Sequence, residues 1–480
     1  MMEMMLTPRR QNRSGVDILN QKKFHMPTAY TILFLLLILV AAATWIIPAG
    51  SYDYVDGVPV AGTYHTVEQN PQGVGDVLKA AFSGFYDAVD VCIFILMVGG
   101  FLGVVMKTGA VDAGVGNVIR LLGGREKWLI PILMLLFGLG GTTYGMWEET
   151  MAFYPLLIPV FLAAGYDAVV GISVILLGAG AGVIASTVNP FATGIAAGFA
   201  GVSLGEGIVL RLLEWVAFEA AAIWFVMAYA AKVKKNPSKS VVGVGAGKIQ
   251  VSMDQQVPFT AKRKVIMALF TLTFLIMVYA VVPFDEMGLP LPTLGWWFPE
   301  LSALFLVAGV VIGLIDRMSE EELVETYVAG CADLLGVAFI IGISRGITVL
   351  MNDGAITDTV LHWGEQALSG AGAISFTLLV FALYLPLTIL IPSSSGLATL
   401  SIPIVAPLGK FAGVGGDLVV TAFQSASGLV NIITPTAAVV MGALALGHVP
   451  YDRWVKYVWK LILWFLLLAL AFLVAGVLLG

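Results

Sequence analysis

Long apolar runs recur along the whole 480-residue chain and limit its fold more than any other feature. A helix needs about 20 apolar residues to cross the hydrocarbon core of a bilayer. Runs near that length predict about nine transmembrane helices. They are residues 27–49, 87–108, 167–199, 207–231, 265–284, 299–316, 330–351, 417–447 and 455–479.

The composition supports the same interpretation. Hydrophobic residues make up 59% of the chain and charged residues only 12%, whereas soluble domains carry about 25% charged residues. Because lipid offers no hydrogen bonds to the backbone, we expect an all-α polytopic membrane protein with the bilayer as its partner. A net charge of −6 gives no indication of a nucleic-acid partner.

Two further apolar regions are divided by a polar tip. Residues 128–164 have the tip Thr142-Thr143-Tyr144-Gly145-Met146-Trp147-Glu148-Glu149, and residues 373–412 have the tip Ser393-Ser394-Ser395-Gly396. Two short arms around a polar tip are typical of a re-entrant hairpin. Such backbone survives at membrane depth only where protein buries it or where it lines a wet cavity.

Proline interrupts two of the long apolar runs. Ser186-Thr187-Val188-Asn189-Pro190 breaks the run 167–199, and Asn431-Ile432-Ile433-Thr434-Pro435-Thr436 breaks the run 417–447. Proline removes a backbone N–H and opens the helical ladder. The freed carbonyls and nearby hydroxyls can then coordinate Na⁺ or bind a substrate at mid-membrane, although a simple proline kink is the alternative.

The two halves of the chain resemble each other in order and spacing. Met106–Val111 matches Met351–Ile356, and Asn189-Pro190 matches Thr434-Pro435 at a similar offset. Lys and Arg in short loops mark the cytoplasmic side, and they give the two halves opposite orientations. We therefore expect two inverted repeats, a cytoplasmic N-terminus and an outside C-terminus. The expected order is 1–26 cytoplasmic segment, 27–231 first repeat, 232–264 cytoplasmic linker, 265–284 connecting helix and 299–480 second repeat.

The tips and the breaks supply the candidate binding residues. Short hydroxyls beside Gly let backbone groups approach a ligand closely, but the same hydroxyls also cap helix ends. Candidate substrate-binding residues are Thr142, Thr143, Glu148, Glu149, Asn189, Ser393, Ser394, Ser395, Thr434 and Thr436. Candidate ion-coupling residues are Ser186, Thr187, Asn189, Asn431, Thr434 and Glu219, with Na⁺ or H⁺ as the ion and no other metal or cofactor expected.

Charged residues inside apolar runs are expensive and usually functional. Glu148 and Glu149 can bind a cationic amino group, couple protons or ligate a cation; the alternatives are an ion pair with Lys or Arg, or exposure at the cytoplasmic surface. Arg345 can meet an anionic group or a tip glutamate, or form a structural ion pair. Arg211 and Glu214 have the spacing of a helical ion pair.

Asp167 and Asp417 occupy equivalent places in the two repeats. Paired membrane aspartates raise the alternative of an intramembrane aspartyl protease. Both residues nevertheless precede predicted helices, where Asp is a common N-cap, and we expect capping. A channel is another alternative of a different class, since it can also contain paired hairpins.

The motif Gly145-x-x-Glu148-Glu149-Thr150-x-Ala152-Phe153, followed by Asn189-Pro190-Phe191, Ser394-x-Gly396 and Thr434-Pro435-Thr436, resembles the YfcC-type family. That family includes arginine/ornithine antiporters and is grouped with anaerobic C4-dicarboxylate carriers. The resemblance covers essentially the whole chain. It implies an ion-transporter fold with a scaffold domain and a mobile transport domain, elevator motion, a homodimer and a bacterial cytoplasmic membrane. Dicarboxylate members carry Ser-Asn-Thr at the tips, where this chain has Thr142-Thr143 and Ser393-Ser394-Ser395.

These observations predict a secondary active transporter, not an enzyme, that carries amino acids. Basic amino acids such as arginine and ornithine fit the paired tip glutamates best, by exchange or with H⁺ or Na⁺ coupling. The alternative within the same class is a carrier of C4-dicarboxylates or other carboxylates.

Overall fold

The computed structural model describes residues 29–479, except 57, 112, 115–116, 118–124, 204, 244–257, 282–283, 285–289 and 297. The predicted cytoplasmic segment 1–26 and much of the predicted linker lie outside the described residues. The first half contains α1 (Ala29–Ala43), α2 (Val74–Asp87), α3 (Val89–Lys107), η1 (Glu126–Trp128), α5 (Leu129–Tyr144), η2 (Glu148–Phe153), α6 (Tyr154–Ala163), α7 (Ala168–Ile184), η3 (Pro190–Gly194), α8 (Ile195–Ala200), α9 (Ile208–Lys235) and η4 (Pro237–Lys239). The second half contains α10 (Ala261–Val281), α11 (Phe298–Asp316), α12 (Glu320–Asp353), α13 (Thr357–Leu368), α14 (Ala373–Leu390), α15 (Ser394–Phe411), α16 (Gly416–Asn431), α17 (Ala438–Leu446) and α18 (Tyr451–Leu479).

Apolar helices dominate the described chain. Five of its helices (α3, α11, α12, α14 and α18) are long and apolar enough to cross a membrane, and α1 and α7 are shorter apolar helices. One boundary differs from the expectation. Ser319 caps α12, with its hydroxyl accepting from the Glu322 N–H, and the helix then continues without interruption to Asp353. The span 330–351 is therefore the later part of one helix that begins at Glu320.

The fold also contains a little β structure, which the all-α expectation omitted. Strand β1 (Gly50–Ser51) pairs with β4 (His65–Thr66), and β2 (Tyr54–Val55) pairs with β3 (Val58–Pro59), both antiparallel. This segment is tied to α13, because the Tyr54 hydroxyl donates to both oxygens of Asp358 at 2.7 and 2.9 Å. Burial, and then that hydrogen bond, raises the pKa of the Tyr54 phenol, so the phenol remains a donor.

Both polar tips interrupt helices where the sequence predicted. Helix α5 ends at Tyr144, and Gly145 follows with φ of 76°, a left-handed conformation that favours glycine. The second arm then begins as η2 and continues as α6. In the other half, α14 ends at Leu390 and α15 begins at Ser394. The two breaks likewise separate α7 from η3 and α8, and α16 from α17.

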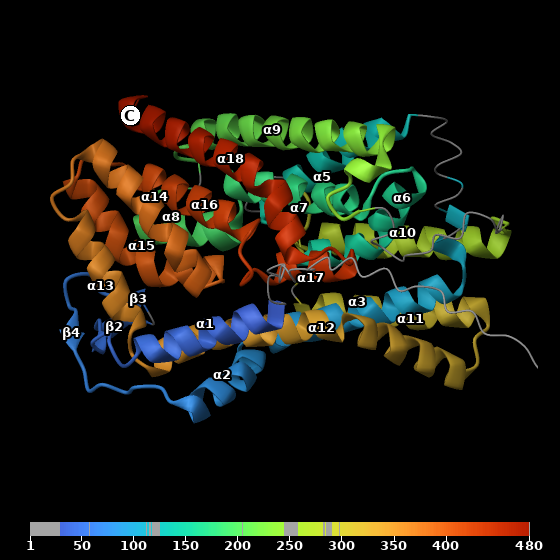
Figure 1. Cartoon of the computed structure of the whole chain (residues 1–480), viewed down its shortest axis with the longest axis horizontal. Helices are drawn as coiled ribbons and strands as arrows, with labels where there is room; N and C mark the ends of the chain where they lie inside the picture. Colours follow the sequence, from blue (N-terminus) through green and yellow to red (C-terminus); the bar gives the residue numbers. More distant parts are fainter. Residues whose placement is uncertain are drawn as a thin grey trace, which may run out of the picture.

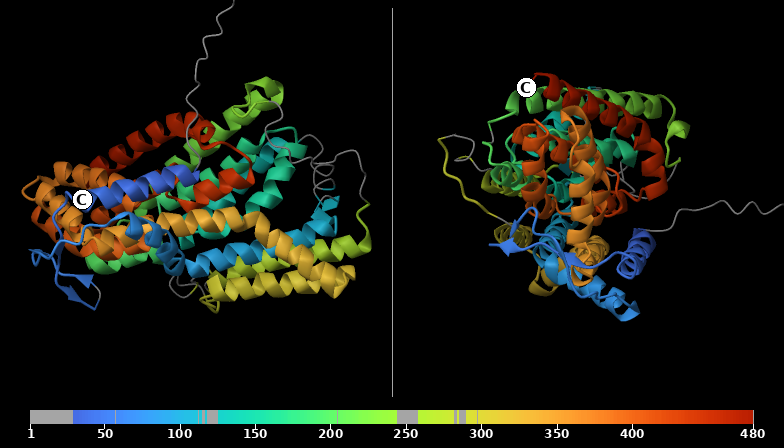
Figure 2. Two further views of the ribbon diagram at one scale, coloured as in Figure 1. Left: turned by 60° about the horizontal axis from the view of Figure 1, so that its bottom comes forward. Right: turned by 90° about the vertical axis from the view of Figure 1, so that its left-hand side faces the viewer.

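The helices form two groups that lie against each other (Figure 1). One group, here called the α12 layer, consists of α1, α2, α3, α10, α11 and α12. The other, here called the hairpin body, consists of α5–α9 and α14–α18. The end-on view in Figure 2 separates the two groups clearly. Helices α9 and α18 pack on α7 and α16 within the hairpin body.

Glycines allow close helix contacts within each group. In the α12 layer, a Cβ built on Gly99 would lie 2.5 Å from the Gly330 carbonyl oxygen of α12. In the hairpin body, a Cβ built on Gly182 of α7 would overlap the Gly138 carbonyl oxygen of α5. Small residues at helix contacts are a common solution where lipid removes the hydrophobic driving force.

Basic residues gather where several helices end together. Lys107 at the end of α3 pairs with Glu322 at 3.6 Å, and Lys262 at the start of α10 pairs with Asp316 at 2.6 Å. Lys234 at the end of α9 pairs with Glu126 at 3.1 Å. The C-terminal end of α18 and the β segment both lie toward the other end of the molecule, on opposite sides of it (Figure 1).

Candidate functional site

A cavity of about 270 Å³ lies at the boundary between the hairpin body and the α12 layer. Both polar tips and both helix breaks contribute to its walls, although they are far apart in the sequence. Its volume suits a small molecule rather than a peptide. The lining residues from the hairpin body include Gly145, Trp147, Glu148, Glu149, Asn189, Ser393, Ser394, Ser395, Asn431 and Thr436.

Glu148 and Glu149 stand at the start of η2, where the chain turns back into its second arm. A helix N-terminus favours negative charge, and Glu149 accepts a hydrogen bond from the Trp147 N–H at 3.1 Å. Glu149 is 5% exposed. None of the ion pairs within the described part of the chain includes either glutamate. Both carboxylates line the cavity rather than the surface, so they are available to a cationic ligand.

The second tip presents the N-terminus of α15 to the same cavity. Ser393 caps this 18-residue helix, and its hydroxyl accepts from the Gly396 N–H at 3.2 Å. Ser394 and Ser395 follow in the first turn, where backbone N–H groups have no partner within the helix. Such a terminus attracts an anionic group such as a carboxylate. The capping alternative therefore holds for Ser393, and it is compatible with a ligand.

Asn189 joins the first break to the first tip. A Cβ on Gly145 would lie 2.5 Å from the Asn189 Nδ2 atom, so only glycine permits this approach. Asn189 therefore lies beside the glutamate-bearing tip, at the wall of the cavity.

The carbonyls freed at the second break already have partners. Trp454 Nε1 donates to the Ile432 oxygen at 3.1 Å, and the Tyr451 hydroxyl donates to the Ile433 oxygen at 2.8 Å. Ser344 of α12 donates to the Thr436 oxygen at 2.7 Å. In this arrangement the three carbonyls hold the break to neighbouring helices; the sequence analysis predicted that such freed carbonyls could coordinate Na⁺ or bind a substrate.

Some predicted site residues lie behind the cavity wall. The Thr142 hydroxyl donates to the Ala185 oxygen at 2.8 Å, and the Thr142 oxygen accepts from the Thr187 N–H at 2.9 Å. These bonds tie the first tip to the first break. Thr143 donates to the Leu139 oxygen of its own helix. Of the other candidates, Ser186, Thr434 and Glu219 are also buried outside the lining.

The α12 layer contributes charged residues that the sequence analysis largely missed. Asp87 at the end of α2 and Asp90 in the first turn of α3 line the cavity with Arg345 of α12. Arg345 Nε lies 3.8 Å from Asp87 Oδ2, in a long ion pair whose Asp87 side chain is 52% exposed. Both aspartates lie at the start of the predicted span 87–108, and neither was among the residues that the sequence singled out. Only the position of α12 beside them gives them a role.

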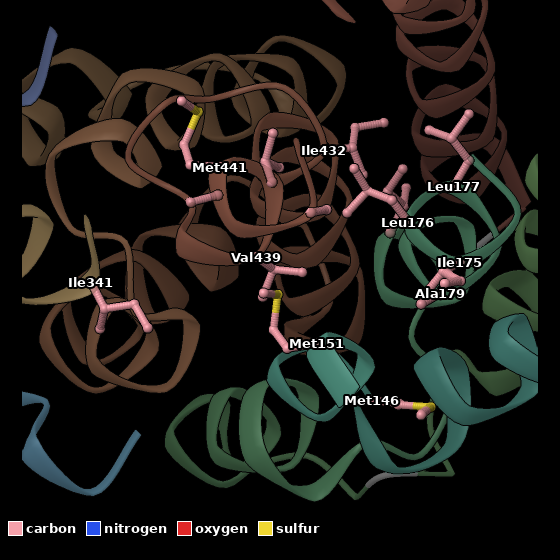
Figure 3. Close-up of a cluster of buried hydrophobic side chains, with 14 of the residues drawn as sticks. Met146, Met151, Ile175, Leu176, Leu177, Ala179, Ile341, Ile432, Val439 and Met441 are labelled. Atoms are coloured by element: carbon pink, nitrogen blue, oxygen red, sulfur yellow. The ribbon is translucent and has the colours of Figure 1, made fainter. Parts of the chain in front are cut away.

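An apolar wall supports the second arm of the first hairpin. Met151 of η2 points toward Val439 of α17 (Figure 3). A Cβ on Gly442 of α17 would overlap the Met151 Cε atom, so glycine makes room for that side chain. The glutamate-bearing tip therefore rests on packed apolar groups from the other half of the chain.

Asp167 and Asp417 are far apart. Asp167 caps α7, as expected, and accepts from Val170 N–H at 3.0 Å and from the Tyr229 hydroxyl. Asp417 is not a cap, because Gly415 holds that position, and it lies beside Gly207. Residues 207 and 229 are at opposite ends of α9, about 33 Å apart at 1.5 Å per residue. The two aspartates therefore cannot share a water molecule as a protease dyad does.

Glu214 and Arg211 are both buried on α9, and each makes a hydrogen bond with a third residue. The Ser425 hydroxyl donates to Glu214 Oε1 at 2.8 Å, and Arg211 Nη2 donates to the Glu206 carbonyl at 2.9 Å. Ser425 belongs to α16, so Glu214 joins two helices of the hairpin body.

Known proteins resemble the chain over almost its full length. The family model described as C4-dicarboxylate anaerobic carrier matches residues 26–478. A Haemophilus influenzae protein of uncharacterised function is 35% identical, across 95% of this chain and 98% of its own length. The Escherichia coli protein YfcC, whose name proposes a basic amino acid antiporter, is 30% identical, across 91% of this chain and 93% of its own.

Solved structures with similarity include two bacterial transporters. The YdaH transporter of Alcanivorax borkumensis gives a TM-score of 0.42 at 15% identity, covering 93% of this chain and 98% of that chain. MtrF of Neisseria gonorrhoeae is described within a class of antimetabolite efflux pumps. It gives a TM-score of 0.42 at 19% identity, covering 93% of this chain and 94% of that chain.

Proposed function

The chain belongs to the C4-dicarboxylate anaerobic carrier family of membrane transporters, and from that premise we propose that it is a secondary carrier of basic amino acids. The charges of the cavity carry this proposal. Four carboxylates line it (Asp87, Asp90, Glu148 and Glu149) against a single guanidinium, that of Arg345. A low-dielectric cavity with this balance favours a ligand with more positive than negative charge.

The polarity of the cavity supports one orientation of the substrate. Its side-chain cation would meet Glu148 and Glu149, since neither forms an ion pair with any described residue. Its carboxylate would meet Arg345 and the N-terminus of α15 at Ser394 and Ser395. Asn189 and Thr436 would supply neutral hydrogen bonds at the two breaks. Arginine and ornithine have charges at both ends and fit this arrangement.

We propose exchange of one basic amino acid for another as the basic reaction, with H⁺ or Na⁺ as a possible driving ion. Cavity walls from two helix groups suit an elevator motion, in which the hairpin body moves against the α12 layer. The inverted repeats and a homodimer belong to the same proposal. The bacterial cytoplasmic membrane is the proposed location, and the basic helix ends at Lys107, Lys234 and Lys262 favour the cytoplasm for that end of the molecule.

Transport of C4-dicarboxylates is the second candidate, favoured by the family description and by Arg345 beside the α15 N-terminus. The charge balance is against it, because a dianion would enter between four carboxylates. Competition by fumarate or succinate, without competition by arginine or ornithine, would select this candidate.

Uptake of labelled arginine into proteoliposomes preloaded with ornithine tests the proposal. Wild type should take up arginine only when ornithine is inside. Glu148→Gln and Glu149→Gln should each lower uptake about tenfold, because a hydrogen bond to a charged group contributes about 1.5–3 kcal/mol. Glu68→Gln, in an exposed loop, is the matched control and should behave as wild type. Unchanged arginine uptake in both tip variants would reject this mode of recognition.

A further inference from the structure

A buried carboxylate lies away from the cavity, in the middle of α9. Glu219 is 2% exposed, and it is about 20 Å along the helix from Lys232, at 1.5 Å per residue. It therefore lies in the middle of the run 207–231, which the sequence predicts to span the membrane. An intramembrane carboxylate is costly to keep and points to a function.

Neither oxygen of Glu219 has a hydrogen-bond partner among the described residues. A space created by glycine accommodates the group, because a Cβ on Gly138 of α5 would overlap Glu219 Oε2. An ionised carboxylate without partners would lose its solvation and gain nothing in return, at a cost of several kcal/mol. The uncharged acid is the form that fits this site.

Within the described ranges, the helices packed around Glu219 place no cation beside it. Helix α5 carries Tyr144 at its last position and no other ionisable residue, and α7 carries none. On α18, Phe465 packs on Phe218 with ring centroids 4.7 Å apart, and the nearest titratable residues, Lys460 and Tyr457, lie one to two turns away. On α9 itself, Glu214 is bound to Ser425, and Arg211 lies a further turn away; η4 brings Lys239 only at the far end.

The place of Glu219 connects it to the glutamate-bearing hairpin. Gly138 lies one turn before Thr142 on α5, and Thr142 holds the tip to the break at Ala185 and Thr187. Ionisation of Glu219 would require water or a counter-charge, and both need α5 to separate from α9. A proton on Glu219 is therefore linked to the position of the first hairpin.

We propose that Glu219 is a proton-binding site that couples H⁺ to movement of the first hairpin. The acid binds a proton in the packed arrangement seen here and releases it when α5 moves and water enters. The proposal deepens the proposed carrier function and rests on it, but the occupancy of the site can be measured without any substrate.

Infrared difference spectroscopy of the purified full chain during a pH change tests the site directly. Wild type should show the carbonyl stretch of a protonated carboxyl, and Glu219→Gln should lose that signal. Glu206→Gln, an exposed position just before α9, should keep it. A signal that persists in Glu219→Gln overturns the proposal. Should that variant fail to fold, Glu219→Asp keeps a carboxyl group and should shift the infrared band without abolishing it. An unshifted band in Glu219→Asp would also overturn the proposal.

Transport then tests the coupling. In proteoliposomes, Glu219→Gln should retain arginine–ornithine counterflow but lose the extra accumulation that an inward pH gradient gives wild type. Equal gradient-driven accumulation in wild type and Glu219→Gln would refute the coupling. Absence of arginine transport in wild type would reject the proposed substrate instead, and the infrared result would still decide whether Glu219 binds a proton.

Discussion

At the scale of single residues, the polar groups at the helix breaks divide into those that hold the fold and those that face the cavity. Carbonyls of Ile432 and Ile433 are bound by Trp454 and Tyr451, since an unpaired backbone group inside a membrane costs several kcal/mol. Side chains at the same breaks, Asn431 and Thr436, remain at the cavity wall. The same helix break therefore contributes to the stability of the fold through its carbonyls and to the cavity wall through its side chains.

Tyr451→Phe removes one hydroxyl and leaves the Ile433 carbonyl without its donor. We expect a loss of about 1–3 kcal/mol of stability, the usual penalty for a buried group left unpaired. Thermal unfolding in detergent measures it. Tyr86→Phe is the control, because that tyrosine is 84% exposed, and it should unfold with wild type. Equal unfolding temperatures for both variants would contradict the structural role of Tyr451.

Arg345→Gln tests recognition of the substrate carboxylate. Loss of the guanidinium should raise the KM for arginine about tenfold, because a charged hydrogen bond contributes about 1.5–3 kcal/mol. The apparent affinity for agmatine, which is arginine without its carboxylate, should be the same in the variant as in wild type. Competition curves for the two compounds provide the comparison. An equal loss of apparent affinity for arginine and agmatine would mean that Arg345 acts on the fold or through Asp87, and not on the substrate carboxylate.

At the scale of elements, the first hairpin is held by close glycine contacts rather than by large side chains. A Cβ on Gly141 of α5 would overlap the Ala179 carbonyl oxygen of α7, and a Cβ on Gly182 of α7 would overlap the Gly138 carbonyl oxygen of α5. This closeness brings Thr142 within hydrogen-bond distance of Thr187. The tip is thus positioned by the packing of the arm beneath it.

Gly182→Val should disrupt this packing, because its Cβ would overlap the Gly138 oxygen and lie 2.7 Å from the Thr142 nitrogen. Overpacking of this kind costs about 1–3 kcal/mol, and the displaced tip should also lower uptake. Gly198→Ala in α8 is the control, since its Cβ would meet nothing within 4 Å. Unfolding temperature and arginine uptake are the two measurements. A variant as stable and as active as the control would show that α5 and α7 tolerate separation.

At the scale of the whole molecule, the two helix groups meet through α12 and α17. Val337 of α12 lies 2.8 Å from a Cβ built on Gly442 of α17, and Ser344 bonds the Thr436 carbonyl nearby. The contact lies beside the cavity and belongs to the boundary at which we propose movement. A covalent link there should stop that movement.

Val337→Cys combined with Gly442→Cys, in a chain whose Cys92 and Cys331 are replaced by Ser, should form a disulfide on oxidation. Arginine exchange should then fall to background and return on reduction, because the hairpin body can no longer move against the α12 layer. Each single variant should be insensitive to oxidant. Undiminished exchange in the fully cross-linked protein would argue against relative movement of the two groups.

The positions of helices, tips and breaks could be predicted from the sequence because they depend on local properties. Apolar length predicts a span, proline at Pro190 and Pro435 predicts a break, and a polar run with Gly145 predicts a turn. The roles of particular hydroxyls could not be predicted in the same way. Thr142 and Ser393 are both polar tip residues. The Thr142 hydroxyl donates a hydrogen bond to the Ala185 carbonyl beside the first break, whereas Ser393 lines the cavity.

The sequence by itself therefore determined that this is a membrane-spanning transporter chain with two interrupted hairpins and a pair of tip glutamates. Only the tertiary structure decided which charges share a cavity, bringing Asp87 and Asp90 from the first half of the chain and Arg345 from the second half to those glutamates. It also placed Glu219 against Gly138, where neither carboxylate oxygen has a hydrogen-bond partner among the described residues. The physical reason is that hydropathy and helix breaking act within a few residues, whereas the partner of a buried charge depends on which helices pack together.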